Sequence, residues 1–435
     1  MISKSIQSCR EAIYRDLQQC RRGTFKLFTD IDYDTFCRQA HPDFSPVGWH
    51  LGHIAYTEDL WLLQRCAGLK PVFPEYHQLF AADILPKKQR VFLPTLPEVE
   101  LYLDAVRKKV LDYLEVAPIA EQERLWRFII QHESQHCETV AFVLQMQRKK
   151  EEESSARHLV TNLTDLRDVT DRRKKKEGRL IADYQLPMTD SPAIEIPGGE
   201  FYMGSDAAEA LDNERSRHLC YLEAYSIDRY PVTCRQYRDF MESGGYQNPD
   251  WWSADGWKWL QSAKVDRPLY WSENPAFNNH PVCGVSWYEA EAFCNFAGKR
   301  LPSEAEWEKA ASWDATNQTY RIYPWGEEQP NGSLCNHGNN IANTSPVDAF
   351  PKGASAAGCW DMLGNVWEWT ASTFDAYPGF ESYPYRGYSQ VYFDGEHRVL
   401  KGGSWATFPQ ALRSSFRNWY YPGVRQIIAG FRCAK

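Results

Sequence analysis

Two histidines four residues apart, His132 and His136, are the strongest chemical feature of this sequence. They lie in a helix-favouring segment, 120–147, where a rotation of about 100° per residue separates them by about 40° on one face. Both imidazoles can therefore hold one metal ion. Gln135 lies about 60° from His132 on the same side of the helix, whereas Glu138 is expected to point away.

The same residues match the HExxH pattern of zinc peptidases, in which Glu133 would be the general base. This short pattern is only moderately specific. The glycine and third histidine of the longer peptidase pattern are absent, because positions 139 and 142 are Thr and Phe. A zinc peptidase is therefore an alternative, and finding iron with thiol-dependent oxygen uptake would exclude it.

A third metal ligand is available from segment 45–55, SPVGWHLGHIA, which is expected to begin a helix with a proline in its first turn. His50 and His53 are three residues apart and could share a face, but only one need reach the metal. Three neutral imidazoles leave positions open for substrates and oxygen, which suits Fe(II) and also catalytic zinc. For His53 alone, the alternative is a core histidine bonded to the backbone.

The elements that must position these histidines belong to the first of two contrasting halves. Residues 1–150 combine good helix formers, apolar residues at three- and four-residue spacing and few glycines, which predicts an antiparallel four-helix bundle. The expected helices are 6–20, 46–66, 96–114 and 120–147. The charged stretch 151–190, with a basic run at 172–176, predicts a linker.

Residues 191–435 are rich in glycine, proline, tryptophan and tyrosine. Short β-like runs and only two expected helices, near 234–243 and 286–297, predict a loop-rich α+β domain held by buried aromatic side chains. The predicted fold class is therefore multidomain, with an α bundle followed by an α+β domain.

Composition narrows the class of protein. The chain has 435 residues and a net charge of −8, with acidic and basic residues mixed, so a nucleic-acid-binding protein is not expected. No apolar run reaches the ~18 residues of a membrane-spanning helix, and the first twenty residues lack a signal-peptide core. Twelve cysteines without a CxxC pair favour a reduced, cytoplasmic protein.

Ordered phrases in the second half resemble a known domain. They are IPGGEFYMG (196–204), PVT (231–233), VSWYEA (285–290), RLPSEAEWE (300–308), YPWG (323–326), GNVWEW (364–369), GGSW (402–405) and GFRC (430–433). Together they resemble the formylglycine-generating-enzyme-type domain, which has a C-type-lectin-like fold, over about 190–435. True formylglycine-generating enzymes have a cysteine pair shortly after Gly-Gly-Ser, but here no cysteine follows Ser404 until Cys433. Cysteine-based oxidation of a sulfatase is therefore not expected.

The first half resembles a DinB-like four-helix bundle, because LGHI (51–54) and His132-x3-His136-x-Glu138 are similar to that family's iron motif. A bundle followed by a lectin-like domain resembles the ergothioneine-biosynthesis sulfoxide synthases (EgtB type) over nearly the whole chain. This resemblance implies Fe(II) held by His53, His132 and His136.

The resemblance also implies a reaction. The family joins a thiol to imidazole carbon 2 of hercynine (trimethylhistidine) and oxidises the sulfur to a sulfoxide. Forming the C–S bond and oxidising the sulfur each remove two electrons, and O2 accepts four, so no reductase or organic cofactor is required.

The resemblance also implies a catalytic tyrosine and contacts to hercynine. The run YPYRGYS (383–389) is similar to the loop that holds the family's catalytic tyrosine, so we expect Tyr385 to be the acid and Tyr388 a pocket wall, with a packed surface turn as the alternative. Tyr383 and Tyr377 are weaker candidates. Gln135, Asn418 and Trp419 are expected to contact hercynine, whose trimethylammonium group needs aromatic faces and oxygen dipoles.

The thiol is expected to be cysteine rather than γ-glutamylcysteine. Members that use γ-glutamylcysteine have Asp and Arg where this chain has Tyr420 and Val424, and Tyr420 is itself expected to contact substrate. Arg90, with Lys87 and Lys88 nearby, is expected to hold a carboxylate of the thiol. The alternatives are an ovothiol-type synthase acting on histidine, a selenoneine synthase, and a non-catalytic lectin-like module that would leave three histidines unused.

Overall fold

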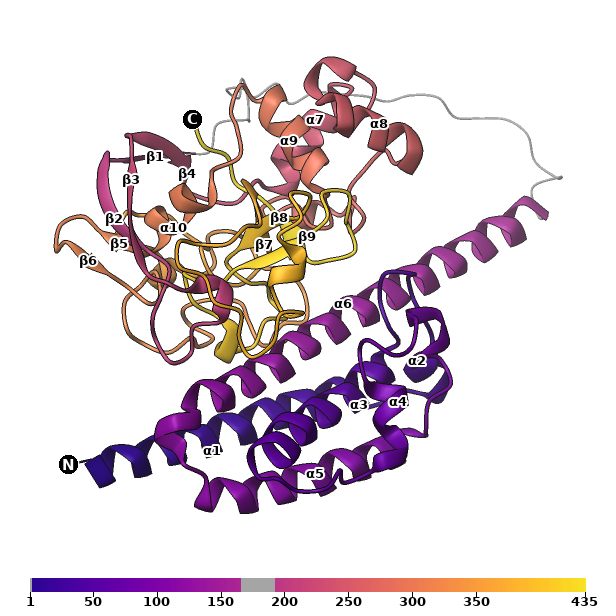
Figure 1. The fold of residues 1–435 in the computed structure, drawn as a ribbon. Helices are drawn as coiled ribbons and strands as arrows, with labels where there is room; N and C mark the ends of the chain where they lie inside the picture. The colour runs from indigo at the N-terminus through magenta and orange to yellow at the C-terminus, as the bar shows by residue number, and fades with distance from the viewer. Residues whose placement is uncertain (1, 166–191) are drawn as a thin grey trace.

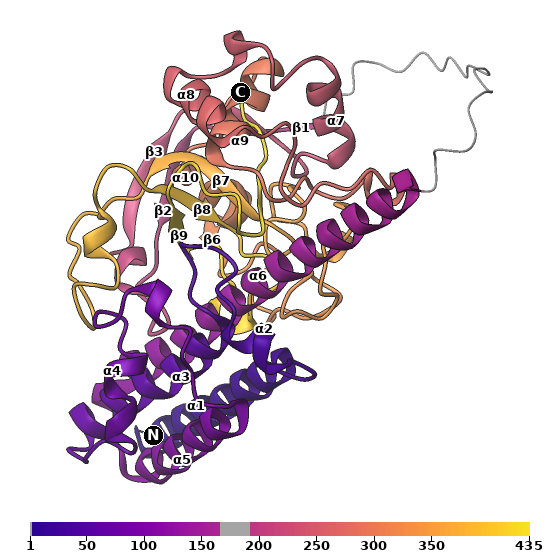
Figure 2. The ribbon, with the colours of Figure 1, turned by 90° about the vertical axis from the view of Figure 1, so that its right-hand side faces the viewer.

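The computed structural model describes residues 2–165 and 192–435. The chain forms a helical bundle followed by a second domain of short strands and helices, and one long bundle helix, α6 (Ile119–Asp165), lies between the other bundle helices and the second domain (Figure 1). The view turned by 90° shows the same order (Figure 2). The predicted multidomain fold, helical bundle first and α+β domain second, is confirmed.

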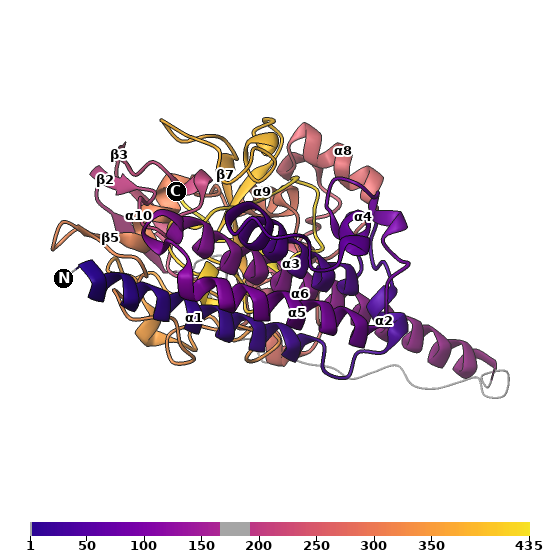
Figure 3. The same cartoon turned by 60° about the horizontal axis from the view of Figure 1, so that its bottom comes forward.

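The bundle contains the four predicted long helices, which lie side by side beneath the second domain (Figure 3). They are α1 (Ile2–Leu27), α3 (Val47–Glu58), α5 (Leu96–Val116) and α6, with the shorter α2 (Tyr33–Cys37) and α4 (His77–Phe80) between them. The chain continues from α3 in wider π-helical turns over Asp59–Cys66, so the segment predicted as one helix has two geometries. Such turns are frequent at functional sites.

Four buried charged side chains, one from each long helix, meet inside the bundle. Arg21 and Arg107 each bridge Glu58 and Glu133, with nitrogen–oxygen distances of 2.6–2.9 Å. Removing one partner from such a buried network typically costs about 3–5 kcal/mol, because a charge is left uncompensated. The network therefore fixes how the four helices pack.

Helix α6 continues to Asp165, past residue 150 where we expected the linker to begin. The remainder of that expected linker, including the basic run 172–176, lies outside the described residues. The division at residues 150 and 190 stays a prediction.

The second domain contains one four-stranded sheet and three two-stranded sheets among its described residues. The larger sheet has the order β10 (Ala429–Gly430), β7 (Trp367–Thr373), β8 (Arg398–Lys401) and β9 (Asn418–Tyr420). Only β10 and β7 are parallel in it, and Val399 lies opposite Trp419. The pairs are β1 (Ala193–Ile196) with β4 (Tyr225–Asp228), β2 (Gly199–Met203) with β3 (His218–Leu222), and β5 (Trp313–Asp314) with β6 (Thr319–Tyr320).

Four α-helices, not two, accompany these strands in the described part of the second domain. The predicted α7 (Cys234–Glu242) and α9 (Trp287–Phe296) are present, but α8 (Ala254–Ala263) and α10 (Glu304–Ser312) were not predicted. The cap of α10 was the available signal, because Ser303 and Glu306 hydrogen-bond each other's backbone N–H groups.

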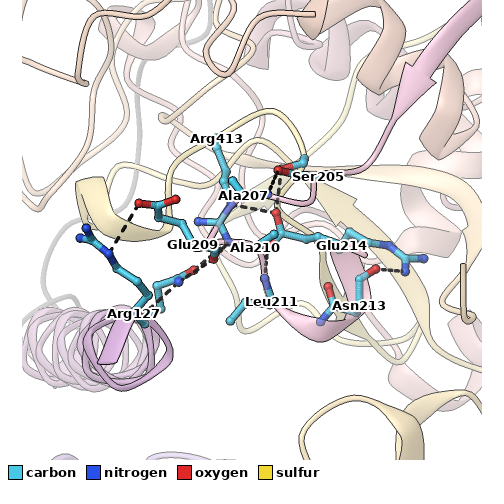
Figure 4. A network of polar contacts seen from close by, with 12 residues as sticks. Arg127, Ser205, Ala207, Glu209, Ala210, Leu211, Asn213, Glu214 and Arg413 are labelled. Atoms are coloured by element: carbon cyan, nitrogen blue, oxygen red, sulfur yellow. Dashed lines mark hydrogen bonds and ion pairs between the residues drawn. The ribbon is translucent and has the colours of Figure 1, made fainter. Parts of the chain in front are cut away.

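A polar network joins the second domain to α6 (Figure 4). Arg413 donates to Glu214 at 2.7 Å and to Gln131 Oε1 on α6, also at 2.7 Å. Gln131 in turn donates to the carbonyl of Glu209 at 2.8 Å, and the Arg127 guanidinium lies 3.6 Å from the Glu209 carboxylate. Because Arg413, Gln131 and Glu214 are buried, these contacts hold the domains in one relative orientation.

Within the described residues, every helix is too short or too polar to cross a membrane.

Candidate active site

Three histidines from two helices converge at the junction of the domains. His53 lies on α3, and His132 and His136 lie one turn apart on α6. One ring nitrogen from each lies within 4.8 Å of the others. The Nε2 atoms of His132 and His136 are 3.1 Å apart, so these two rings face one point.

The three imidazoles are neutral at physiological pH. Burial lowers the pKa of His53 to about 4 and holds the pKa of His132 and His136 well below the usual 6.5. Neighbouring imidazoles lower the pKa of His132 and His136 further. Neutral rings present lone pairs, so the donor set fits a divalent transition metal, Fe(II) or Zn2+ included.

The orientation of His53 comes from its own helix and from Phe80. Its Nδ1 lies 2.6 Å from the Phe80 carbonyl oxygen, so Nε2 is the nitrogen that can bind a metal ion. A Cβ on Gly52 would lie 2.1 Å from the Phe80 ring, so only glycine allows this close approach. The glycine of the LGHI motif thus lets Phe80 come close enough for its carbonyl to hold the adjacent His53.

The HExxH glutamate is turned away from the histidines. Glu133 accepts from Arg21 at 2.8 Å, from Arg107 at 2.8 Å and from Thr24 at 2.6 Å inside the bundle. The two guanidinium groups hold the pKa of Glu133 below its usual value despite its burial. A peptidase base must face the metal, so this geometry contradicts the peptidase interpretation.

Glu138 also points away from the histidines, as predicted from helix geometry. Its Oε1 accepts from the Trp367 indole at 2.8 Å and the Ser404 hydroxyl at 2.5 Å, and Thr407 donates to it as well. Burial raises the pKa of Glu138. The Gly-Gly-Ser segment, which lacks the cysteine pair of formylglycine-generating enzymes, therefore anchors the histidine-bearing helix to the second domain.

A cavity of about 1170 Å3 opens beside the three histidines and is lined by both domains. It brings together most of the residues predicted to contact substrate or metal. Those in its wall are His53, His132, His136, Gln135, Tyr385, Tyr388, Asn418, Trp419 and Tyr420.

Aromatic rings form the side of the cavity contributed by the second domain. Trp419 stacks on Phe374 with ring centroids 4.2 Å apart and meets Tyr388 edge-on at 6.0 Å. The Tyr388 hydroxyl donates to Gln135 Oε1 at 2.9 Å, and Asn418 Oδ1 accepts from the backbone N–H of Trp419. The wall thus offers ring faces beside amide groups, which can surround an organic cation.

Tyr385 is the more open of the two predicted tyrosines. Its ring stacks on that of Trp61 with the centroids 5.7 Å apart, and the residue is 40% exposed. Partial burial raises the pKa of Tyr385 to about 12, so the phenol keeps its proton at physiological pH. The weaker candidates are absent from the cavity wall: Tyr383 lies under Arg124, and the Tyr377 hydroxyl donates to Glu304.

Arg90, predicted to hold a substrate carboxylate, is directed elsewhere. Its guanidinium donates to the Leu85 and Ala82 carbonyls and to the Ser45 hydroxyl, and it is absent from the cavity wall. It also lies 4.0 Å from the ring of Trp49, which stacks on His53 at 4.7 Å. Arg90 therefore packs behind Trp49 and His53 instead of facing the cavity.

Two basic side chains other than Arg90, those of Lys87 and Arg65, line the cavity wall. Lys87 lies in the predicted basic loop, whereas Arg65 was not identified from the sequence. Tyr56 was also missed; its ring lies 6.0 Å from that of His53. Its spacing of three residues after His53, on the same helix face, was the available signal.

Comparison with known proteins agrees with this two-domain arrangement. Residues 16–140 match the DinB superfamily, and residues 184–435 match the sulfatase-modifying factor enzyme 1-like domain. A hercynine oxygenase from Mycolicibacterium smegmatis is 36% identical, and the alignment covers 98% of this chain and 99% of that relative. The chain belongs to the hercynine oxygenase family.

Two further hercynine oxygenases also align with this chain over nearly the full length of both proteins. The relative from Mycolicibacterium thermoresistibile is 37% identical over 98% of this chain and 95% of its own length. The relative from Mycobacterium tuberculosis is 38% identical over 96% of this chain and 97% of its own length. The family resemblance predicted from the sequence motifs is confirmed across both domains.

Proposed function

We propose that this chain is a non-haem Fe(II), O2-dependent oxygenase that acts on hercynine and a thiol. The observation that supports this most directly is the convergence of His53, His132 and His136 beside a cavity lined by both domains. The near-full-length similarity to hercynine oxygenases supports the choice of substrate.

The proposed reaction forms a bond between the thiol sulfur and carbon 2 of the hercynine imidazole. That carbon loses its hydrogen, the thiol loses its proton, one atom of O2 becomes the sulfoxide oxygen and the other leaves as water. The four electrons removed equal the four that O2 accepts. Fe(II) held by the three imidazoles would supply oxygen activation and a common template for both substrates.

Hercynine is proposed to occupy the aromatic side of the cavity. Its trimethylammonium group has no N–H donor, so ring faces and amide oxygens must hold it. Trp419 and Tyr388 offer the faces, and Gln135 and Asn418 offer the amide groups. Binding there would hold the imidazole near the three histidines and away from bulk water.

We propose cysteine as the preferred thiol, with γ-glutamylcysteine as the alternative. Tyr420 and Val424 line the cavity where an acid and an arginine would serve a glutamyl group. Lys87 and Arg65, both in the cavity wall, can hold the cysteine carboxylate. Arg90 would act indirectly, by supporting the loop that includes Lys87 through its bonds to Ala82 and Leu85.

Tyr385 is proposed as the proton donor of the reaction. It lines the cavity and retains its phenolic proton, because its pKa is raised to about 12. A positioned donor can supply a proton as the C–S bond forms. We further propose a reducing, cytoplasmic location, which the twelve unpaired cysteines support.

The decisive experiment is an oxygen-uptake assay on protein loaded anaerobically with Fe(II). Hercynine or histidine is paired with cysteine, γ-glutamylcysteine or a selenosugar, and the products are identified by mass spectrometry. We expect hercynine with cysteine to give a sulfoxide and stoichiometric O2 consumption. A product from histidine alone would indicate an ovothiol-type enzyme, a product from the selenosugar alone would indicate a selenoneine synthase, and none from any pair would overturn the proposal.

A further inference from the structure

A fourth histidine lies behind the three that converge. His50 is on α3, one turn before His53, is only 6% exposed and is absent from the cavity wall. Its Nδ1 lies 2.8 Å from Nδ1 of His136. Its ring meets Trp49 edge-on at 5.4 Å, so the packing around it holds it in place.

A hydrogen bond between two Nδ1 atoms needs one proton, and the metal site decides which ring has it. The Nε2 atom of His136 faces Nε2 of His132 at 3.1 Å, so Nε2 is the atom directed at the metal position. A neutral imidazole that binds through Nε2 has its hydrogen on Nδ1. His136 must therefore donate, and His50 must accept through Nδ1.

This assignment leaves His50 with its own hydrogen on Nε2. That atom is buried and has no hydrogen-bond partner among the described residues. Buried N–H groups without a partner are rare in native proteins and call for an explanation. Here the acceptor role at Nδ1 requires this tautomer, which explains the unsatisfied donor.

We infer that His50 is a positioning residue, which fixes the tautomer and ring orientation of His136 so that the Nε2 lone pair points at the metal site. The Phe80 carbonyl does the same for His53, at 2.6 Å. Partners of this kind also raise the donor strength of the coordinated ring. The inference rests on the proposed three-histidine metal site.

Two substitutions separate this role from simple packing. Asn at position 50 keeps an acceptor close to the place of Nδ1, whereas Leu fills similar space without one. Affinity for Co2+, an oxygen-stable substitute for Fe(II), is measured by competition with a coloured chelator on the full-length chain. We expect His50→Leu to weaken binding by ~10–100-fold and His50→Asn by less than ~3-fold. The thermal midpoint of the metal-free protein reports folding separately.

Unchanged Co2+ affinity in His50→Leu would overturn the inference, as would equal weakening in both variants, which would indicate packing alone. If His50→Leu does not fold, His50→Phe replaces it as the variant without an acceptor. Failure of the unaltered protein to bind Co2+ or Fe(II) is a different result. It would overturn the proposed metal site, and the role of His50 with it.

Discussion

The Tyr388 hydroxyl, in the second domain, donates a hydrogen bond of 2.9 Å to Oε1 of Gln135, on the helix that holds two of the three converging histidines. The amide nitrogen of Gln135 donates to the Gln131 carbonyl at 3.3 Å, so both ends of the amide are held. One contact between domains thus orients a polar group in the wall of the cavity.

Replacing Tyr388 with Phe tests this contact. The ring and its packing on Trp419 remain, but Gln135 loses the donor that orients it. We expect the KM for hercynine to rise about 10-fold, the value of one lost hydrogen bond, with metal content unchanged. Steady-state kinetics measure it, and Tyr383→Phe, outside the cavity, is the matched control. An unchanged KM would contradict a role for Gln135 orientation.

Single replacements of the three histidines test the metal site. We expect His53→Ala, His132→Ala and His136→Ala each to lose most bound iron and all thiol-dependent oxygen uptake, because two imidazoles hold the ion poorly. Glu138→Gln should retain iron, since Glu138 faces Ser404 and not the histidines. Metal analysis after anaerobic loading decides. Normal iron and turnover in His53→Ala would refute the three-histidine assignment.

Tyr385→Phe tests the proton donor. Phenylalanine keeps the ring stacked on Trp61 but removes the proton, so iron and both substrates should still bind. We expect the sulfoxide to be lost while oxygen is still consumed, with cysteine converted to its sulfinic acid. Chromatography of the products measures the ratio. An undiminished sulfoxide yield would exclude Tyr385 as the donor and direct attention to Tyr388 and Tyr56.

The choice of thiol can be tested with Lys87. We expect a higher kcat/KM for cysteine than for γ-glutamylcysteine, and a decrease of about 10-fold for cysteine in Lys87→Ala, through loss of one charge-assisted contact. Lys88→Ala is the control, because Lys88 is exposed and absent from the cavity wall. A strong preference for γ-glutamylcysteine would mean that other residues bind the glutamyl group.

The buried Glu133 carboxylate should make the stability of the fold depend on pH. Its pKa in the folded protein is below the usual 4.5, so its ionised form stabilises the fold at higher pH, and that contribution is lost as the pH falls through the folded pKa. We expect Glu133→Gln to lower the free energy of unfolding by about 3–5 kcal/mol at pH 7. The difference from the unaltered protein should shrink toward pH 3.

Urea unfolding at both pH values measures this difference. Glu123→Gln is the control, because Glu123 pairs with Arg127 on the same helix at 3.4 Å but its side chain is 35% exposed, and pairs open to solvent contribute less than about 1 kcal/mol. Unchanged stability together with loss of a proteolytic activity would instead support the peptidase interpretation.

Local sequence determined where the long helices form and which residues share a face of one helix. The rotation per residue places His132 and His136 on one face and turns Glu138 away, whatever the helix packs against. For these reasons the bundle and the histidine pair could be predicted from the sequence.

Only the tertiary structure decided how side chains on different helices meet. His50 and His53 lie on one helix face, but the packing of α3 on α6 brings His53 beside His132 and His136, whereas Nδ1 of His50 contacts Nδ1 of His136. The same packing turns Arg90 toward Trp49. These outcomes depend on the rotation and distance between helices, which arise from the fit of whole surfaces and have no signature in residue spacing.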